Sequence, residues 1–326
     1  MRRLGYGLAI NEATTQLMES DSRIVVIGQG LWSPWYIGNS MVQLEKKFGK
    51  ERVIDSPVSE SGVTGVGVGA ALAGLYPIVV HPRMDFMILA SDQIFNQAAM
   101  WHYMFGGAVN VPIVIRGIIN RGGEQAAQHS QSLQSWYAHH PGLKVVMPAT
   151  AYDAKGLFIS AVRDPNPVIY IDDRWLYSSE DDVPEDMYEV PIGSGKVRRQ
   201  GNDVTLVAIS AMVPLAMEAA TMAAEEGIDV EVIDPRSVRP LDEEMIIHSV
   251  RKTGRLVVAE LAWRHCSISS EIIAICAERA FNHFRAPARR VTLPECPAPA
   301  SRSLEQAYYP TARAILDALR ETSKSR

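Results

Sequence analysis

Short runs of apolar, mostly β-branched residues recur along the first half of the chain, at positions 23–29, 76–82, 111–117, 143–149 and 167–172. Runs of this length without polar alternation are typical of strands that are buried on both faces. Between them, residues 91–105 and 151–163 have helical spacing or a helix-forming composition. The alternation of strands and helices predicts an α/β fold with a mostly parallel sheet flanked by helices.

Residues 178–202 interrupt this alternation. The segment is acidic at positions 180–182, rich in turn-forming residues at 193–195 and basic at 196–199. We therefore predict a first domain at residues 1–188 and a second domain at 189–326. In the second domain the alternation resumes, with strands expected at 203–210, 229–236, 255–261 and 289–295 and helices at 214–226, 242–252 and 269–284. The polar residues 321–326 are expected to fray.

The composition is that of an ordinary globular protein. Hydrophobic residues make up 47% and charged residues 21% of the 326 residues, and a chain of this length exceeds what one hydrophobic core commonly holds. The formal net charge is −5, and Lys and Arg are scattered along the chain instead of forming a basic stripe. We therefore expect two domains and no nucleic-acid partner.

The expected location is the cytoplasm. The N-terminus runs directly into an amphipathic, helix-like stretch without a signal peptide, and no run of about eighteen apolar residues indicates a membrane span. Cys266, Cys276 and Cys296 are too few for a disulfide framework or a four-ligand metal site. They fit free thiols in a reducing compartment.

A glycine-rich stretch at residues 62–74 allows two interpretations. Closely spaced glycines can let a pyrophosphate approach a helix N-terminus, but here residues 56–60 separate them from the preceding strand. The favoured interpretation is a helix whose small residues let another backbone pack closely. Glu60, just before this helix, is either an acid favoured by the helix dipole or a functional, partly desolvated carboxylate.

His129 is the best candidate for proton transfer. It lies in a long polar connection between two predicted strands, and such connections hold ligands in open α/β sheets. Its neighbours Gln128, Ser130 and Gln131 can fix the imidazole tautomer, although a surface histidine in a polar loop remains an alternative. The sequence shows no nucleophile-elbow serine, zinc-protease helix or Cys-x-x-Cys pair, so neither a hydrolase triad nor a structural zinc site is indicated.

Several strings of residues resemble the beta chain of the first component of two-subunit 2-oxo acid dehydrogenases, of the pyruvate and branched-chain type. In the first half they are DSPVSESG (55–62), MDF (84–86), ASDQI (90–94), AAQHSQ (126–131), WY (136–137), PGLKVV (141–146) and DAKG (153–156). In the second half they are IDPR (233–236), RPLD (239–242) and TGR (253–255). Because the strings follow the family's order and spacing over nearly the whole chain, the sequence is identified as a member of this transketolase-like family.

The resemblance implies a transketolase-like pyrimidine-binding domain followed by a transketolase C-terminal domain, assembled with a separate alpha subunit into an α2β2 enzyme. The alpha chain would hold the diphosphate of thiamine diphosphate and its magnesium, and this chain would supply the aminopyrimidine half of the site. Glu60 would hydrogen-bond a pyrimidine ring nitrogen, Phe86 would pack on the ring, and His129 would act in proton or acyl transfer. Gln29 and Leu31 complete the expected cofactor-binding residues.

The resemblance also implies a potassium ion held by backbone carbonyl groups. The matching positions are Ile113, Ala161, Asp164 and Asn166. Because carbonyl ligation leaves little signature in the side chains, the sequence supports this site only through the turn-forming residues 163–167.

The chain departs from the family where substrate and acceptor are expected to approach. Gln29 stands where an acidic residue is usual, Glu124 and Gln125 stand where small residues are usual, and residues 264–269 replace a glycine-containing turn. The identity of the substrate and the acceptor therefore stays open. The leading hypothesis is an enzyme that decarboxylates a small 2-oxo acid and passes the acyl unit to a lipoyl acyltransferase. The alternatives are a split transketolase-like or acyloin-type carboligase without a lipoyl partner, and a non-catalytic scaffold.

Overall fold

The computed structural model describes residues 2–33 and 35–324, and the chain divides into two compact units. The first unit consists of Met1–Arg121 and Gln128–Ile192, and the second consists of Gly122–Ala127 and Gly193–Arg326. The short segment 122–127 thus belongs with the second unit, although both of its flanks belong to the first. The boundary expected between residues 188 and 189 stays a prediction.

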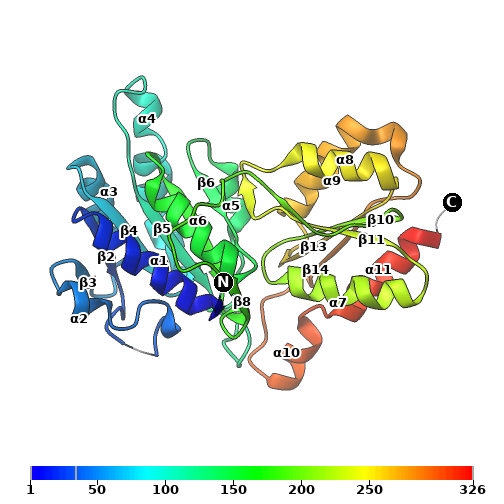
Figure 1. Ribbon diagram of the computed structural model, residues 1–326, viewed down its shortest axis with the longest axis horizontal. Helices are drawn as coiled ribbons and strands as arrows, with labels where there is room; N and C mark the ends of the chain where they lie inside the picture. The colour runs from blue at the N-terminus through cyan, green and yellow to red at the C-terminus, as the bar shows by residue number, and fades with distance from the viewer. Residues whose placement is uncertain (1, 34, 325–326) are drawn as a thin grey trace. The chain divides into compact units, whose positions relative to one another are not determined.

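The first unit is built on a parallel sheet flanked by helices (Figure 1). Its strands lie in the order β6 (Lys144–Val146), β7 (Val168–Asp173), β5 (Val114–Ile119), β4 (Tyr76–His81), β2 (Ile24–Gly28) and β3 (Val53–Asp55). Each neighbouring pair among them runs parallel. Every residue of β2, β5 and β7 is buried, which explains the uninterrupted apolar runs in the sequence.

Helices α1 (Tyr6–Ser20) and α6 (Ala151–Arg163) pack along each other, and α3 (Glu60–Leu72) packs on β4 (Figure 1). Helix α6 begins and ends at the predicted residues, and its first turn is stabilised because Thr150 Oγ1 accepts a hydrogen bond from the Asp153 amide. The helix predicted at 91–105 is instead interrupted. It consists of the π-helical segment η3 (Gln93–Ala98) and the short α4 (Trp101–Met104).

Two strands of the first unit were not expected from the sequence, and one of them contains the acidic residues 180–182. Strand β1 (Arg2–Gly5) pairs antiparallel with β8 (Glu180–Val183), which places Arg3 opposite Asp182. A basic strand is therefore paired with an acidic one, as cross-strand charge pairing favours. Local periodicity does not reveal the pair, because Arg3 and Glu180 are 177 positions apart in the sequence.

The remaining elements of the first unit are short. The strand predicted from residue 111 begins only at Val114, because Pro112 has no amide hydrogen to give to a strand ladder. Connections and turns contain η1 (Gly38–Ser40), α2 (Leu44–Phe48), η2 (Met84–Ala90), α5 (Gln134–His139) and η4 (Arg174–Leu176).

The second unit is built on a five-stranded sheet flanked by helices (Figure 1). The strands lie in the order β14 (Arg289–Leu293), β13 (Leu256–Trp263), β10 (Val204–Ala208), β11 (Val230–Asp234) and β9 (Lys196–Arg199). Strand β9 is antiparallel to β11, whereas the other pairs are parallel. The predicted fold class, two α/β domains with mostly parallel sheets, is confirmed.

Two pairs of helices accompany this second sheet. Helix α7 (Met212–Glu225) packs with α11 (Ala312–Lys324), and α8 (Glu243–Thr253) packs with α9 (Ile268–Ala280). Residues 321–324, which were expected to fray, form the last turn of α11, and residues 325 and 326 lie outside the described residues. The smaller elements are β12 (Ser237–Arg239), η5 (Phe281–His283) and α10 (Arg302–Tyr308).

The glycines of α3 have different surroundings. A Cβ atom on Gly67 would lie 2.5 Å from Cγ2 of Val79 on β4, so the small residue lets this helix approach its own sheet closely. Gly69 points elsewhere, and a Cβ atom there would meet nothing within 4 Å. The glycine-rich stretch is therefore a helix, as expected, and its two glycines serve different roles.

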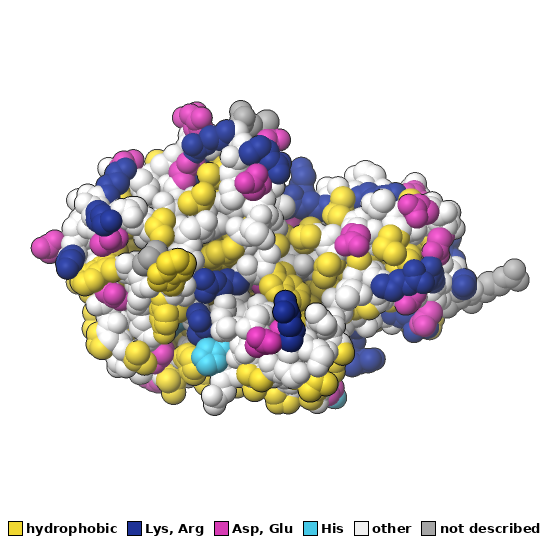
Figure 2. Space-filling model, turned by 90° about the horizontal axis from the view of Figure 1, so that it is seen from below, with side chains coloured by type: hydrophobic (Ala, Val, Ile, Leu, Met, Phe, Trp, Pro, Cys, Tyr) yellow, Lys and Arg dark blue, Asp and Glu magenta, His cyan; other side chains and the backbone are white. Residues whose placement is uncertain are grey.

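The surface shows no gathering of one charge on the face drawn in Figure 2, where Lys and Arg side chains are interspersed with Asp and Glu and with patches of hydrophobic side chains. This distribution differs from the basic stripe that a nucleic-acid-binding surface needs. Among the described helices, none combines the length and the apolar character needed to span a bilayer.

Candidate active site

Glu60 is the first residue of α3, where the helix dipole favours a carboxylate. Its side chain is buried, with a relative exposure of 6%. Gln29, the residue that follows β2, donates a hydrogen bond from Nε2 to Glu60 Oε1 over 3.0 Å. Within the described part of the chain, Glu60 Oε2 makes no hydrogen bond. The structure thus brings the two predicted residues Gln29 and Glu60 together and leaves one carboxylate oxygen available to a ligand.

His81 is the last residue of β4 and lies near the same carboxylate. Its Nε2 atom is 3.1 Å from Thr64 Oγ1, one helical turn beyond Glu60. Burial lowers the pKa of His81 to about 4, although the negative charge of Glu60 acts in the opposite direction. The imidazole is therefore neutral near neutral pH, so Glu60 has no cationic histidine beside it.

Phe86 and His129 meet although they come from different segments. Phe86 belongs to η2, and His129 lies in the connection between β5 and α5. Their ring centroids are 5.5 Å apart and the rings are nearly perpendicular, with an interplanar angle of 86°. This is a favourable edge-to-face arrangement. Both side chains are only partly buried, so part of each ring can face a ligand.

The remaining predicted cofactor residue, Leu31, has a side chain that is only 1% exposed. Its backbone amide donates a hydrogen bond to Oδ1 of Asp55, at the end of β3, over 3.2 Å. The side chain of Leu31 therefore belongs to the core, and its expected role in cofactor binding stays a prediction.

Arg121 holds the start of the connection that carries His129 through a hydrogen bond and an ion pair. The Nη2 atom of Arg121 donates to Ser132 Oγ over 2.7 Å and also lies 2.7 Å from Asp173 Oδ2. Both members of the Arg121–Asp173 ion pair are almost fully buried. Such a pair costs desolvation free energy, and it gives the loop a defined starting geometry.

The four residues expected to hold potassium lie around the end of α6. The carbonyl oxygen of Ala161 accepts from the Asp164 amide over 3.3 Å, and that of Ile113 accepts from the Val168 amide over 3.0 Å. A helical bond to Ala161 from position 165 is impossible because Pro165 has no amide hydrogen. Asn166 Oδ1 is buried and has no hydrogen-bond partner in the described part of the chain. The carbonyl oxygens of Ala161 and Ile113 each keep a second lone pair, and oxygen acceptors of this kind suit an alkali cation. The backbone carbonyl groups of Asp164 and Asn166 stay predicted ligands.

A cavity of about 630 Å³ in the first unit adjoins this region. Its lining residues are Ala99, Met100, His102, Tyr103, Pro141, Gly142, Leu143, Lys144 and Asn166. The predicted cofactor residues are not among them. Among the residues that the structure describes, no three His, Cys, Asp or Glu side chains are grouped so that they could hold a metal ion.

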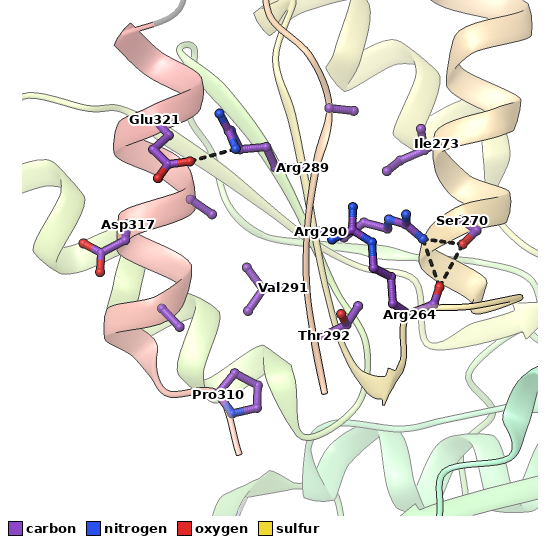
Figure 3. Close-up of a pocket in the computed structure, with 13 residues that line it drawn as sticks. Arg264, Ser270, Ile273, Arg289, Arg290, Val291, Thr292, Pro310, Asp317 and Glu321 are labelled. Carbon is purple, nitrogen blue, oxygen red and sulfur yellow. Dashed lines mark hydrogen bonds and ion pairs between the residues drawn. The ribbon is translucent and has the colours of Figure 1, made fainter. Parts of the chain in front are cut away.

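A second cavity, of about 700 Å³, lies in the second unit beside β14 (Figure 3). Arg290 Nη1 donates to the carbonyl oxygen of Arg264 over 3.0 Å and to Ser270 Oγ over 2.6 Å. Arg289 and Glu321 point toward each other and form an ion pair of 2.7 Å (Figure 3). Arg289 and Arg290 thus each have a polar partner, although the buried Nε atom of Arg289 has no hydrogen-bond partner in the described part of the chain.

Sequence reasoning missed two neighbours of the site. It gave no functional role to His81, and it gave none to Asp85 within the MDF string. A signal existed for each, because His81 ends a buried parallel strand, where ligands of such sheets bind, and Asp85 is a carboxylate in an otherwise apolar stretch.

The chain belongs to the transketolase-like family of thiamine-diphosphate enzymes. Residues 3–179 match the transketolase pyrimidine-binding domain, and residues 193–315 match the transketolase C-terminal domain. Its relatives include beta subunits of 2-oxo acid dehydrogenase-type enzymes, so the resemblance drawn from the sequence is confirmed.

Two of these relatives show how complete the match is. The chain is 42% identical to the acetoin:2,6-dichlorophenolindophenol oxidoreductase subunit beta of Cupriavidus necator, over 99% of this chain and 98% of that protein. It is 41% identical to the pyruvate dehydrogenase E1 component subunit beta of Rickettsia conorii, over 96% of each. Among solved structures, a split-gene transketolase described as an inactive beta4 tetramer superposes with a TM-score of 0.81 at 23% identity, covering 99% of both chains. That likeness shows the fold.

Proposed function

We propose that this chain is the beta subunit of a thiamine-diphosphate-dependent enzyme that decarboxylates a 2-oxo acid and transfers the acyl unit to an acceptor. The observation that carries the proposal is the buried Glu60 carboxylate, held through Oε1 by Gln29 and available through Oε2. The full-length similarity to the pyruvate dehydrogenase E1 component subunit beta supports the reaction class. The same similarity does not favour the alternative of a carboligase without a lipoyl partner.

The residues present fit the aminopyrimidine half of thiamine diphosphate. A pyrimidine ring needs an acceptor for a ring N–H group and an aromatic surface, and Glu60 and the half-buried Phe86 offer these. We assign the diphosphate and its magnesium to an alpha subunit in an α2β2 assembly.

When bound, the cofactor supplies a carbon nucleophile for the carbonyl group of the 2-oxo acid. Glu60 Oε2 accepts a hydrogen bond from the protonated ring nitrogen and so holds the proton there. Gln29 orients that carboxylate through Oε1. The neutral His81 leaves the charge of Glu60 uncompensated by any cation at that position. Phe86 packs on the ring, and His129 moves a proton at the reacting centre or assists acyl transfer.

We further propose that a potassium ion binds the carbonyl groups of Ile113, Ala161, Asp164 and Asn166. The C-terminal end of α6 carries a partial negative charge, which favours a cation there. A lipoyl acyltransferase is the proposed acceptor partner. The cytoplasmic location expected from the sequence stays a prediction.

The proposal is tested by the Glu60→Gln variant, which keeps the size of the side chain but cannot hold the ring nitrogen protonated. We expect hydrogen–deuterium exchange at the thiazolium carbon of the reconstituted complex to slow by about a hundred- to ten-thousand-fold, the usual worth of acid–base catalysis. His129→Ala is the matched control, because it should spare this exchange and impair acyl transfer. Exchange at the wild-type rate in Glu60→Gln would return Glu60 to the role of a helix-terminus acid.

A further inference from the structure

Asp85 is a buried carboxyl group to which the proposed mechanism gives no task. It precedes Phe86 in η2, and its relative exposure is only 4%. Placing a carboxyl group in the interior costs free energy unless the group gains hydrogen bonds or opposite charge. A buried aspartate between Met84 and Phe86 therefore calls for a structural or functional partner.

The partner is the loop that carries His129. Asp85 Oδ1 accepts a hydrogen bond from the backbone amide of Gln131 over 3.1 Å. Asp85 Oδ2 is buried and has no hydrogen-bond partner in the described part of the chain. The carboxyl group thus contacts the backbone of a residue two positions beyond His129, and the side chain of Gln131 and the amide of Asp85 itself also interact with it.

This hydrogen bond connects the two segments whose rings meet in the site. Phe86 is the residue after Asp85, and His129 lies two residues before Gln131. Fixing Asp85 to Gln131 therefore fixes η2 relative to the loop, and it restricts how far the Phe86 and His129 rings can separate from their 5.5 Å contact.

Three ionisable side chains face this carboxyl group from the elements around it, namely Arg83, His129 and Tyr137. Burial raises the pKa of Asp85, and the Gln131 amide and His129 oppose that rise. Burial also raises the pKa of Tyr137, and the charge of Asp85 adds to this effect. Asp85 therefore interacts electrostatically with these three groups, and its carboxyl group is largely shielded from bulk solvent.

We infer that Asp85 is a positioning residue, which holds His129 against Phe86 through its hydrogen bond to the Gln131 backbone. The inference rests on the proposed roles of Phe86 and His129, but its geometry can be measured without any activity. Three variants separate the possibilities. Asp85→Ala removes the acceptor, Asp85→Asn keeps an acceptor oxygen without the charge, and Asp92→Ala removes an exposed carboxylate nearby and serves as the control.

The experiment uses the full chain with ¹³C-labelled histidine, and the His129 signal is assigned with His129→Gln. The rings of His129 and Phe86 are nearly perpendicular and in contact. The His129 ring signals therefore carry a ring-current shift from Phe86 that reports this contact. Hydrogen exchange of the Gln131 amide reports the hydrogen bond. In Asp85→Ala we expect exchange to accelerate about tenfold, as the loss of one hydrogen bond implies, and the ring-current shift to fall. Asp85→Asn and Asp92→Ala should keep both wild-type values.

Unchanged exchange and an unchanged His129 signal in Asp85→Ala would overturn the inference. Equal losses in Asp85→Asn and Asp85→Ala would also overturn it, because the acceptor oxygen would then not be the cause.

If Asp85→Ala does not fold, Asp85→Leu fills a similar volume without an acceptor and gives the same test. In the complex with the alpha subunit, Asp85→Ala should lower acyl transfer while leaving thiazolium exchange unchanged. Loss of that exchange in Glu60→Gln tests the proposed function separately.

Discussion

At the scale of single residues, the site places a buried glutamate, Glu60, near a histidine that stays neutral. His81 is buried at the end of β4, and its Nε2 atom contacts the Thr64 hydroxyl group. Desolvation is the main cause of its low pKa of about 4, and it outweighs the attraction of the nearby carboxylate. The same burial makes the stability of the fold depend on pH.

We predict that His81 destabilises the folded chain as the pH falls. The folded pKa of about 4 lies below the ordinary value of 6.5, so the unfolded chain binds the proton more readily. Above pH 6.5 His81 is neutral in both states and does not lower the free energy of unfolding. Between pH 6.5 and pH 4 only the unfolded chain binds the proton, so the free energy of unfolding falls with the pH. At pH 5 this loss amounts to about 2 kcal/mol. Urea unfolding at pH 7 and pH 5 should show a smaller pH effect in His81→Gln than in wild type.

The control for this prediction is His139→Gln, which changes an exposed histidine in the same unit. It should retain the wild-type difference between pH 7 and pH 5. An equal pH effect in wild type and His81→Gln would mean that the imidazole is not neutral in the folded chain.

At the scale of elements, helix α3 carries a site residue at its start and has one face packed on the sheet and one face exposed. Its first residue is Glu60, its inner face packs on β4, and Gly62, Val66 and Gly69 are exposed on the other side. Exposed small and apolar residues at helical spacing can receive a partner helix. The two glycines of this helix therefore allow fold and assembly to be tested separately.

We predict opposite outcomes for Gly67→Leu and Gly69→Leu. The first places a side chain where Val79 Cγ2 already lies within 2.5 Å, so overpacking should lower the free energy of unfolding by about 1–3 kcal/mol. The second meets open space and should leave the isolated chain folded, but it should weaken assembly with the partner subunit. Thermal unfolding and sedimentation of each variant check the two outcomes. An unaltered oligomer in Gly69→Leu would remove the assembly role from this face.

At the scale of the whole molecule, the proposed function gives this chain half of a cofactor site. Glu60, Gln29, Phe86 and His129 suit a pyrimidine ring, whereas the described residues offer no cluster for the magnesium of the diphosphate. Most of the binding free energy of the cofactor is therefore expected from contacts with the alpha subunit.

We predict that the isolated chain binds thiamine diphosphate weakly. Titration calorimetry with magnesium should detect no micromolar binding to this chain alone, because only the pyrimidine contacts are available. The same titration with the reconstituted complex is the control and should show tight, magnesium-dependent binding. Tight binding to the isolated chain would contradict a site divided between subunits.

The sequence by itself determined the α/β class and the strands that are buried on both faces. A strand such as β2 or β7 has no exposed side, so its residues form an uninterrupted apolar run that a local pattern reveals. Glu60, Phe86 and His129 were identified through motifs that lie on single segments. Glu60 could be placed at the start of a helix because the small and apolar residues that follow it directly in the sequence predict that helix.

Which of these segments meet became apparent from the folded chain alone. It paired β1 with β8, set the Gln29 amide against Glu60, and joined Asp85 to the Gln131 backbone. It also placed residues 122–127 with the second unit while His129, two residues later, belongs to the first. Local periodicity carries no record of such contacts, because each depends on the packing of residues far apart in the chain.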